Sequence, residues 1–206
     1  MIAVTGASGL LGQHLVERLA GEGHPVVAVV RKDTTRFPEG VEVREADVLD
    51  PLGLAQAVSG AATVVHAAGL VSFNPRRRDE IFAVNVEGTR NLVNACLKEG
   101  VPALVHISSV AALGRKPGLP VKEEDPWVGL YVNDYARSKY LAELEAFRGG
   151  EEGLTVSAVN PSVILSGNPL HRSSGSLFDY AWKEKPFYTS GTLNYVDIRD
   201  VADAVV

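Results

Sequence analysis

Three glycines, spaced three residues apart, separate a short apolar run from the first helical pattern of this 206-residue chain. They are Gly6, Gly9 and Gly12, and the apolar run before them is Ile2–Thr5. Glycine permits tight turns because it tolerates positive φ, and it permits close backbone contacts because it has no Cβ. A strand that passes through such a turn directly into a helix opens a βαβ unit. The turn therefore restricts the chain to folds with parallel strands.

The rest of the chain repeats this alternation of short apolar runs and longer helical patterns. The runs are rich in valine and mostly apolar on both faces, as parallel strands covered on both sides should be. The predicted strands are Ile2–Thr5, Val26–Val30, Val41–Arg44, Thr63–Ala67, Ala103–Ile107 and Thr155–Val159. The predicted helices are Leu10–Gly21, Pro51–Ser59, Asp79–Gly100 and Asp134–Phe147. This order predicts an α/β fold, a doubly wound parallel sheet of the Rossmann type.

The glycine turn is predicted to hold a phosphate group. Backbone N–H groups at Ser8, Gly9, Leu10 and Leu11 lie at a helix N-terminus, where they and the helix dipole favour an anion. Gly6 allows the tight turn, Gly9 lets the backbone approach a pyrophosphate, and Gly12 lets the helix pack closely on the strand. A strand before the turn, a helix after it and a second strand ending about 20 residues on are the context of a dinucleotide site. We predict that all six of these residues bind NAD(P).

The residue after the second strand bears on the choice of cofactor. NAD-specific sites commonly place an acidic residue there for the ribose 2′-hydroxyl. This chain has Arg31, a cation that suits a 2′-phosphate, so NADP is the preferred cofactor. NAD remains the alternative, because Asp33 follows two residues later and Arg31 can equally be a solvated strand end.

Two further segments are predicted to line the cofactor. Asp47 and Val48 follow the third strand, where a carboxylate can accept a hydrogen bond from the adenine amino group. The alternative for Asp47 is a cap for the helix at Pro51, although Asp50 is better placed for that. The small residues Ala67-Ala68-Gly69 follow the fourth strand and fit a wall beside the ribose and nicotinamide.

A tyrosine and a lysine four residues apart are the candidate chemical groups. Tyr135 and Lys139 share one face of the helix predicted at Asp134–Phe147. A free tyrosine has a pKa near ~10, and an ammonium nearby favours the phenolate. We expect Lys139 to lower the pKa of Tyr135, so that the phenol works as a general acid or base. The same lysine can hold the cofactor ribose.

Candidate residues also follow the fifth and sixth strands. Ser108 and Ser109 come at the carboxyl end of the fifth strand, where parallel sheets bind their ligands. A serine hydroxyl there can orient a substrate oxygen, and a simple turn serine is the alternative. Pro161 and Val163 follow the sixth strand, and their backbone groups are predicted to hold a carboxamide.

Composition excludes several other classes of protein. The chain is 46% hydrophobic and 22% charged, which is ordinary for one sizeable core. Its net charge is −5, and its one basic cluster, Arg76–Arg78, is predicted to be a solvated loop, so we expect no nucleic-acid partner. The single cysteine, Cys96, and His66 are predicted to be core residues, and no Cys/His spacing fits a metal.

No apolar run approaches the ~18 residues of a membrane span, and the N-terminal residues do not resemble a signal peptide. We expect a soluble, cytoplasmic protein without a membrane partner.

The pattern loosens after Pro161. Residues 162–176 are predicted to form a loop, with a short helix at Leu177–Lys183, a strand at Leu193–Val196 and a helix capped by Asp197 or Asp200. We therefore divide the chain into a dinucleotide-binding domain at 1–160 and the start of a substrate-binding region at 161–206, apparently incomplete.

Taken together, the motifs resemble those of the extended short-chain dehydrogenases/reductases, of the NAD(P)-dependent epimerase/dehydratase kind. The resemblance covers essentially the whole chain. Two segments, Val71-Ser72-Phe73 and Tyr195–Asp200, resemble the dihydroflavonol-reductase and 3β-hydroxysteroid-dehydrogenase branch more than the sugar-nucleotide epimerases. The motifs are Thr5–Gly12, Asp47, His66-Ala67-Ala68, Asn85-Val86-Glu87-Gly88-Thr89, Ser108-Ser109, Tyr135-Ala136-Arg137-Ser138-Lys139, Asn160-Pro161 and Tyr195–Asp200.

The resemblance implies a role for each matched residue. Tyr135 is the general acid/base, Lys139 lowers its pKa and binds ribose, and Ser109 aligns best with the catalytic serine, with Ser108 as the alternative. Asn85 lies where the family has an asparagine near the active site, and we count it among the cofactor-binding residues. The resemblance also implies a homodimer through the helices at about 79–100 and 134–147, and family members extend further at the C-terminus.

Three functions are compatible with these residues. The first is an NAD(P)-dependent oxidoreductase acting on a small carbonyl or alcohol. The second is a nucleotide-sugar epimerase or dehydratase, in which the cofactor is reduced and reoxidised within one turnover. The third, a redox-sensing protein that binds NADP(H) without turnover, is disfavoured by the intact Ser/Tyr/Lys set.

Overall fold

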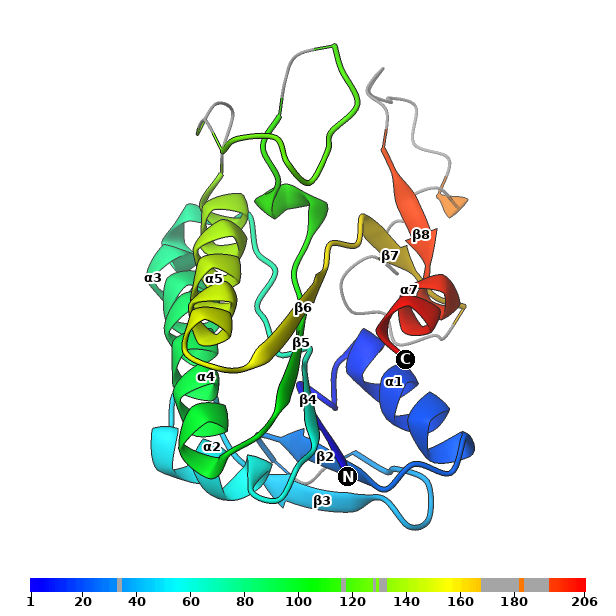
Figure 1. Ribbon diagram of the computed structural model, residues 1–206. Coiled ribbons are helices and arrows are strands. Elements are labelled where there is room, and N and C mark those ends of the chain that lie inside the picture. Colours follow the sequence, from blue (N-terminus) through cyan, green and yellow to red (C-terminus); the bar gives the residue numbers. More distant parts are fainter. Residues whose placement is uncertain (33–34, 116–117, 128, 130–132, 168–181, 184–192) are drawn as a thin grey trace.

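A six-stranded parallel sheet forms the centre of the molecule (Figure 1). The computed structural model describes residues 1–32, 35–115, 118–127, 129, 133–167, 182–183 and 193–206. The strands are β1 (Ile2–Thr5), β2 (Val26–Val30), β3 (Glu42–Glu45), β4 (Thr63–His66), β5 (Ala103–Ile107) and β6 (Thr155–Val159). Their order, β3-β2-β1-β4-β5-β6, is that of a doubly wound Rossmann sheet, as predicted.

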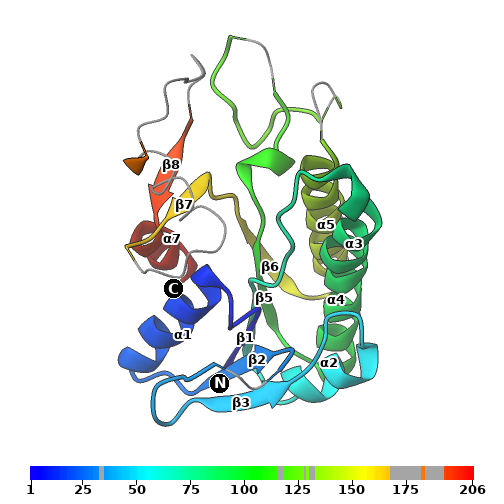
Figure 2. The same ribbon diagram turned by 180° about the vertical axis from the view of Figure 1, so that it is seen from behind.

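Helices cover both faces of this sheet (Figures 1 and 2). On one face lie α1 (Leu10–Gly21) and α7 (Ile198–Val205); on the other lie α2 (Pro51–Val58), α4 (Gly88–Glu99) and α5 (Asp134–Glu151). The chain leaves β1 toward one edge of the sheet and later enters β4 on the other side of β1. The carboxyl ends of β1 and β4 therefore flank the switch point, where ligands bind in folds of this kind.

Five of the ten elements predicted before Pro161 appear with the predicted bounds. Strands β1, β2, β5 and β6 and helix α1 match residue for residue, and β3 begins one residue later than expected. The helix predicted at Asp79–Gly100 is different. A 3₁₀ turn (Pro75–Arg77) leads into α3 (Arg78–Phe82), and a π turn (Ala83–Glu87) separates α3 from α4. A π turn contains one more residue than an α-helical turn. The apolar periodicity does not reveal this extra residue, so the sequence predicted a single helix.

The C-terminal region differs more from the prediction. Residues 163–165, predicted as loop, form β7, which pairs in parallel with β8 (Tyr195–Asp197) in a separate two-stranded sheet. Of the two candidate caps for the last helix, Asp197 is the one that accepts a hydrogen bond from Arg199 N–H. The helix predicted at Leu177–Lys183 lies almost wholly outside the described residues.

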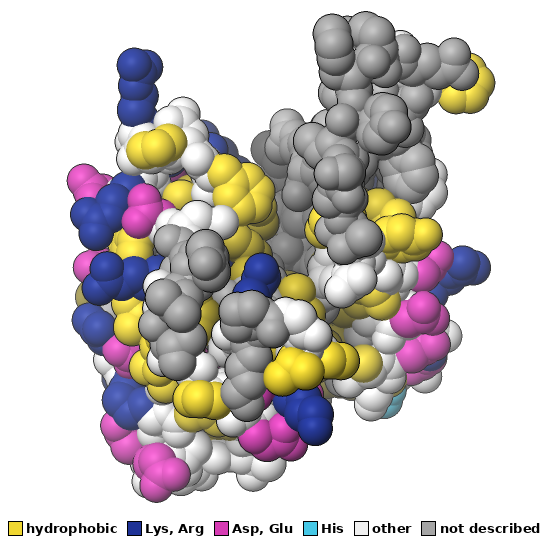
Figure 3. All heavy atoms as spheres, turned by 90° about the horizontal axis from the view of Figure 1, so that it is seen from above, with side chains coloured by type: hydrophobic (Ala, Val, Ile, Leu, Met, Phe, Trp, Pro, Cys, Tyr) yellow, Lys and Arg dark blue, Asp and Glu magenta, His cyan; other side chains and the backbone are white. Residues whose placement is uncertain are grey.

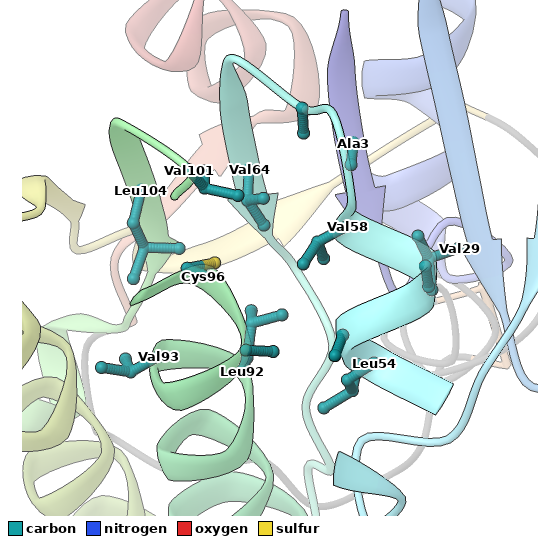
Figure 4. Close-up of a cluster of buried hydrophobic side chains, with 14 of the residues drawn as sticks. Ala3, Val29, Leu54, Val58, Val64, Leu92, Val93, Cys96, Val101 and Leu104 are labelled. Carbon is teal, nitrogen blue, oxygen red and sulfur yellow. The ribbon is translucent and has the colours of Figure 1, made fainter. Parts of the chain in front are cut away.

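The two faces of the sheet have separate cores. Under α2 and α4, Val64, Leu92, Cys96 and Leu104 are almost completely buried (Figure 4). Burial raises the pKa of the Cys96 thiol to about 12, so this cysteine is a core residue, as predicted. On the other face, α1 and α7 bury a second cluster that includes Ile198. The division of the chain at residue 160 remains a prediction.

A chain of hydrogen bonds crosses the buried face beneath α4. Thr89 on α4 donates its single hydroxyl proton to the Asn85 carbonyl at 2.6 Å, so it must accept from His66 Nε2 at 3.0 Å. The other ring nitrogen, Nδ1, then accepts from the Thr5 hydroxyl at 2.7 Å. Burial, together with the charge of Lys139, lowers the pKa of His66 to about 3, so the ring is neutral and its tautomer is fixed.

The neighbouring histidine has no such network. His106 lies beside His66 in the register of β4 and β5, with 5.4 Å between ring centroids. Neither ring nitrogen of His106 has a hydrogen-bond partner among the described residues, although the side chain is 1% exposed. The two buried rings therefore contribute differently to stability, because an unpaired buried polar group costs free energy.

Replacing these two histidines separately tests the network. His66→Leu leaves the buried Thr5 hydroxyl without its acceptor. His106→Leu removes two ring nitrogens that have no partner among the described residues, so no other group loses a hydrogen bond. We expect His66→Leu to lower the free energy of unfolding by about 1–3 kcal/mol more than His106→Leu does. Urea denaturation of both variants at neutral pH measures the difference, and equal losses would contradict the network.

Candidate active site

The glycine turn brings backbone against backbone. Gly6 has φ +67°, and a Cβ at this residue would lie 2.5 Å from the Ala68 nitrogen, at the end of β4. A Cβ at Gly12 would lie 2.1 Å from the Gly6 carbonyl oxygen, far inside van der Waals contact. These two glycines therefore set the close packing of β1, α1 and β4 at the switch point.

Gly9 differs from its two neighbours in the motif. It is exposed, and a Cβ there would meet only the Gly6 carbonyl oxygen, at 3.1 Å. Gly9 is the N-cap of α1 with no side-chain cap, and the first turn, which begins at Leu10 and Leu11, contains no acidic residue. The Gly9 N–H itself donates to the Gly6 carbonyl at 2.9 Å. The uncapped helix N-terminus that follows, with its positive dipole end, suits the pyrophosphate of a dinucleotide. Ser8 is exposed on the same turn.

The predicted adenosine-binding residues lie at the carboxyl edge beside β2 and β3. Arg31 is exposed just after β2, and its charge is close enough to Glu80 to lower the pKa of that carboxyl, which Arg77 lowers more. The exposed Asp47 accepts a hydrogen bond from Leu49 N–H at 2.9 Å, closing a local turn. The competing residue in this choice, Asp33, lies outside the described part of the chain.

The alternative role for Asp47 was to cap the helix that begins at Pro51. As expected, Asp50 has that role instead. Asp50 caps α2 by accepting from Leu52 N–H at 3.1 Å. Val48 is buried, and a Cβ on Gly88 would lie 2.8 Å from its side chain. The Val48 carbonyl accepts from the Asn91 side-chain amide at 3.0 Å, and the predicted cofactor contact of Val48 remains a prediction.

The wall after β4 connects the glycine turn to the catalytic candidates. Ala67 and Ala68 are half-buried beside Gly6, and Gly69 is exposed. A Cβ on Gly69 would lie 3.5 Å from Asn85 Oδ1 and 4.0 Å from Lys139 Nζ. The predicted nicotinamide wall and the predicted ribose-binding lysine are thus adjacent.

Asn85 is buried in the π turn, and its side chain holds the segment that follows β4. Its amide donates to the Leu70 carbonyl at 3.0 Å and to the Ser138 hydroxyl at 2.9 Å, while its oxygen accepts from Leu70 N–H at 2.7 Å. Ser138 in turn donates to the Tyr135 carbonyl at 2.7 Å. The predicted cofactor contact of Asn85 remains untested, but its side chain fixes the loop and α5 relative to each other.

Ser109 and Tyr135 are in hydrogen-bond contact. Ser109 accepts from Ala111 N–H at 3.1 Å, which caps a short 3₁₀ turn, and its hydroxyl lies beside the Tyr135 phenol. Burial raises the pKa of Tyr135, and the hydrogen bond from Ser109 partly offsets that rise. Of the two candidate serines, Ser109 therefore meets the tyrosine.

Lys139 is 6% exposed and lies one turn after Tyr135 on α5. Its ammonium donates to the Ile107 carbonyl at 2.8 Å. Burial lowers the pKa of Lys139 to about 8, opposed by the charge of Glu143. The predicted lowering of the Tyr135 pKa is wrong for this geometry, because desolvation of the phenol outweighs any help from the lysine.

The remaining predicted residues lie at the ends of β5 and β6. Ser108 is buried and its hydroxyl has no partner among the described residues, while its N–H donates to the Val159 carbonyl. The Pro161 carbonyl accepts from Val110 N–H at 3.0 Å, and Val163 N–H donates to Asn194. The carbonyl of Pro161 and the N–H of Val163 are therefore used within the protein.

Sequence reasoning gave no role to Asn160 and Glu143. Asn160 donates to the Ser109 carbonyl at 3.2 Å and to the Glu143 carboxylate at 2.8 Å. The spacing of Glu143, four residues after Lys139, was the available signal, because such residues share a helix face.

The rim above the site is apolar. Phe73 is 71% exposed, and its ring meets that of Tyr135 edge-on with 5.7 Å between centroids. Val71, Leu119 and Val121 are other large hydrophobic residues exposed in the loops of this region. Viewed onto the carboxyl edge, hydrophobic side chains gather along a groove (Figure 3).

The sequence of the chain matches one family model. The model of the NAD dependent epimerase/dehydratase family covers residues 2–206. The chain belongs to this family.

The curated relatives include a sterol demethylase protein and a cinnamoyl-CoA reductase. The chain is 32% identical over 206 residues to sterol demethylase protein B of Methylococcus capsulatus, covering 96% of this chain and 62% of that protein. It is 32% identical over 233 residues to cinnamoyl-CoA reductase 1 of Oryza sativa subsp. japonica, covering 100% and 66% respectively. The chain thus spans less than two thirds of these relatives.

Solved structures share the fold. The crystal structure of gox2253 superposes with a TM-score of 0.89 at 33% identity, covering 100% of this chain and 64% of that one. MoeE5 in complex with UDP-glucuronic acid and NAD gives a TM-score of 0.82 at 28% identity, covering 98% and 70%.

The described residues contain neither a metal-binding cluster nor a membrane-spanning helix. No group of three or more His, Cys, Asp or Glu side chains there is arranged to hold a metal ion. No helix in the same part of the chain is long and apolar enough to span a membrane.

Gly9 and Gly12 give a matched test. Gly12→Ala places a methyl group against the Gly6 carbonyl and should cost about 2 kcal/mol or more of unfolding free energy. Gly9→Ala should cost about 1 kcal/mol or less, yet reduce NADH affinity at least about tenfold, because the methyl group occupies the path of the pyrophosphate. Urea denaturation and a fluorescence titration separate the two. Unchanged NADH affinity in Gly9→Ala would refute this position for the pyrophosphate.

Proposed function

We propose that the protein is an NAD(P)-dependent oxidoreductase that interconverts a carbonyl and an alcohol, with Tyr135 as general acid/base. The observation that carries the proposal is the contact between the Ser109 hydroxyl and the Tyr135 phenol, with the buried Lys139 one helical turn away. Family membership and the open helix end at Gly9 support NAD(P) as the redox partner. When bound, the nicotinamide supplies or accepts the hydride.

The side chains divide the remaining work. Because the Ser109 hydroxyl lies beside the Tyr135 phenol, a substrate oxygen bound next to both can accept a proton from each. In reduction, Tyr135 donates this proton to the nascent alkoxide. Ser109 helps to polarise the carbonyl, and Lys139 presents its ammonium next to Gly69, where the ribose is proposed to lie.

The direction of the pKa shifts favours reduction near neutral pH. Burial raises the pKa of Tyr135, so the phenol carries its proton and is ready to act as an acid. Lys139, with a pKa of about 8, is mostly charged at pH 7 and loses that charge in mild alkali. Both groups are therefore in the protonation states that carbonyl reduction needs.

The rim supports an apolar substrate. Exposed Phe73 touches the ring of Tyr135, so a substrate that reaches the phenol must pass an aromatic face. The alternative, nucleotide-sugar epimerisation or dehydration, is supported by the likeness to MoeE5 in complex with UDP-glucuronic acid and NAD. Net oxidation of NADPH by a simple carbonyl distinguishes the two, because an epimerase leaves the cofactor unchanged after each turnover.

We prefer NADP over NAD as the cofactor, on the strength of Arg31 alone. The family model, which is named for NAD, and the NAD-bound neighbour support NAD, the alternative.

Other features of the protein remain proposals. A homodimer through α4 and α5 is supported by Leu144 and Phe147, which are exposed on α5, and analytical ultracentrifugation tests it. The cytoplasmic location and the substrate-binding role of residues 161–206 rest on the sequence.

Tyr135→Phe tests the acid/base role. Loss of the phenol hydroxyl should lower the rate of NADPH oxidation with aromatic aldehydes about 10²–10⁴-fold, the usual contribution of a general acid, with NADPH affinity nearly unchanged. Tyr140→Phe, on the same helix and stacked on Trp127, is the matched control and should retain full activity. Retained turnover in Tyr135→Phe would rule out the proposed acid.

Arg31→Ala tests the cofactor preference. If Arg31 binds the 2′-phosphate, its loss should lower the ratio of NADPH affinity to NADH affinity about tenfold or more, as expected for a charged hydrogen bond. Lys32→Ala removes the adjacent exposed cation and should leave that ratio almost unchanged. A fluorescence titration of each variant with both cofactors supplies the ratios, and a constant ratio in Arg31→Ala contradicts the preference for NADP.

A further inference from the structure

Glu143 and Asn160 lie behind the proposed catalytic residues and have no part in the steps described above. Glu143 is one turn after Lys139 on α5, and it is half-buried. Asn160 immediately follows β6 and donates to both the Glu143 carboxylate, at 2.8 Å, and the Ser109 carbonyl, at 3.2 Å. One amide therefore joins three elements: the end of β6, helix α5 and the segment after β5.

Lys139 needs a counter-charge because its surroundings oppose an ammonium. The side chain is 6% exposed, and its ammonium donates to a neutral acceptor, the Ile107 carbonyl. The titratable groups that face it are His66 from β4, His106 from β5, and Tyr135 and Glu143 from α5. Both histidines are buried and neutral, and Tyr135 keeps its proton.

Among these groups, Glu143 is the one that carries a negative charge near neutral pH. We propose that Glu143 and Asn160 are positioning residues: Glu143 keeps the buried ammonium of Lys139 charged, and Asn160 holds that carboxylate and the Ser109 backbone in fixed relation. We call the pair Glu143 and Asn160 the brace. It sets the charge of Lys139 and the position of Ser109.

The proposal makes a pH-dependent prediction about stability that does not require any substrate. Lys139 has a pKa of about 8 in the folded protein, below its ordinary 10.5, so its burial destabilises the fold at neutral pH and this penalty disappears as the pH rises. Without the carboxylate of Glu143, the folded pKa falls further and the penalty at neutral pH grows. Above the pKa of Lys139 in both proteins, the contribution of Glu143 through this lysine is zero.

The experiment compares two Glu→Gln variants on the same helix. Glu143→Gln keeps an oxygen that can accept from Asn160 but loses the charge. Glu145→Gln makes the same chemical change two residues on, where the partners are Arg90 and Arg148. Arginine does not titrate in the range of the experiment, so the cost of Glu145→Gln should be constant.

Urea denaturation at about pH 6.5 and about pH 10 gives the result. We expect the loss of unfolding free energy in Glu143→Gln to shrink by at least about half between these pH values, while that of Glu145→Gln stays constant. In a Lys139→Met background, the loss caused by Glu143→Gln should not depend on pH. A pH-independent loss in Glu143→Gln, or a dependence that survives Lys139→Met, overturns the proposal.

If Glu143→Gln does not fold at neutral pH, a variant that combines it with Lys139→Met tests the proposal. Glu143→Gln with Lys139→Met should fold, because the uncompensated cation is gone, and failure of the double variant to fold counts against the brace.

A second measurement connects the brace to cofactor binding, and this part rests on the proposed function. As the pH rises from about 7 to about 9, NADH affinity should fall earlier in Glu143→Gln than in the wild type, by about one pH unit. Wild-type protein that shows the stability effect but binds neither NADPH nor NADH would leave the role of Glu143 and Asn160 intact and overturn the proposed function instead. NADH affinities that fall in parallel would refute the role of Glu143 in cofactor binding.

Discussion

The neutral ring of His66 joins the two halves of the site. Through Thr5 it holds the strand that leads into the glycine turn, and through Thr89 and Asn85 it reaches the loop after β4 and helix α5. Each donor in this chain has one acceptor, so the ring has one tautomer and one orientation. A network that is fully satisfied in a low-dielectric interior is rigid, because moving any member leaves a buried group unpaired. The proposed phosphate and proton-transfer sites, which lie far apart in the sequence, are therefore held in one fixed arrangement.

The same burial that makes this network rigid also sets the protonation states at the rim. It lowers the pKa of Lys139 to about 8 and raises that of Tyr135, so the two groups shift in opposite directions, both toward the neutral form. Spacing on a helix predicted that the lysine would act on the tyrosine. In the fold, however, the ammonium is directed at the Ile107 carbonyl and the phenol at Ser109. Desolvation is a property of the assembled core, and four residues of spacing carry no information about it.

Elements governed by local rules were predictable from the sequence. The glycine turn fixed the boundaries of β1 and α1, because Gly6 and Gly12 permit contacts that any Cβ would block. The alternation of elements fixed the parallel sheet, and Asp50 and Asp197 cap the helices that follow them. Features that depend on distant partners were missed. The π turn around Asn85 exists where its amide can reach both Leu70 and Ser138, and β7 exists because β8 pairs with it from about 30 residues away.

The proposed reductase and the alternative epimerase would both use Tyr135 for proton transfer, so this residue does not distinguish them. The difference must come from what the rim admits. A nucleotide sugar is charged and heavily hydroxylated, and its groups need polar partners when they are desolvated. Phe73 and Val71 offer apolar surface at the entrance to Tyr135, and an exposed phenylalanine loses nothing by being covered with another apolar group. A hydrophobic carbonyl compound gains free energy from that contact, whereas a sugar ring gains little. The contact between Phe73 and Tyr135 therefore supports the proposed reductase over the alternative epimerase, by placing apolar surface beside the proposed proton donor.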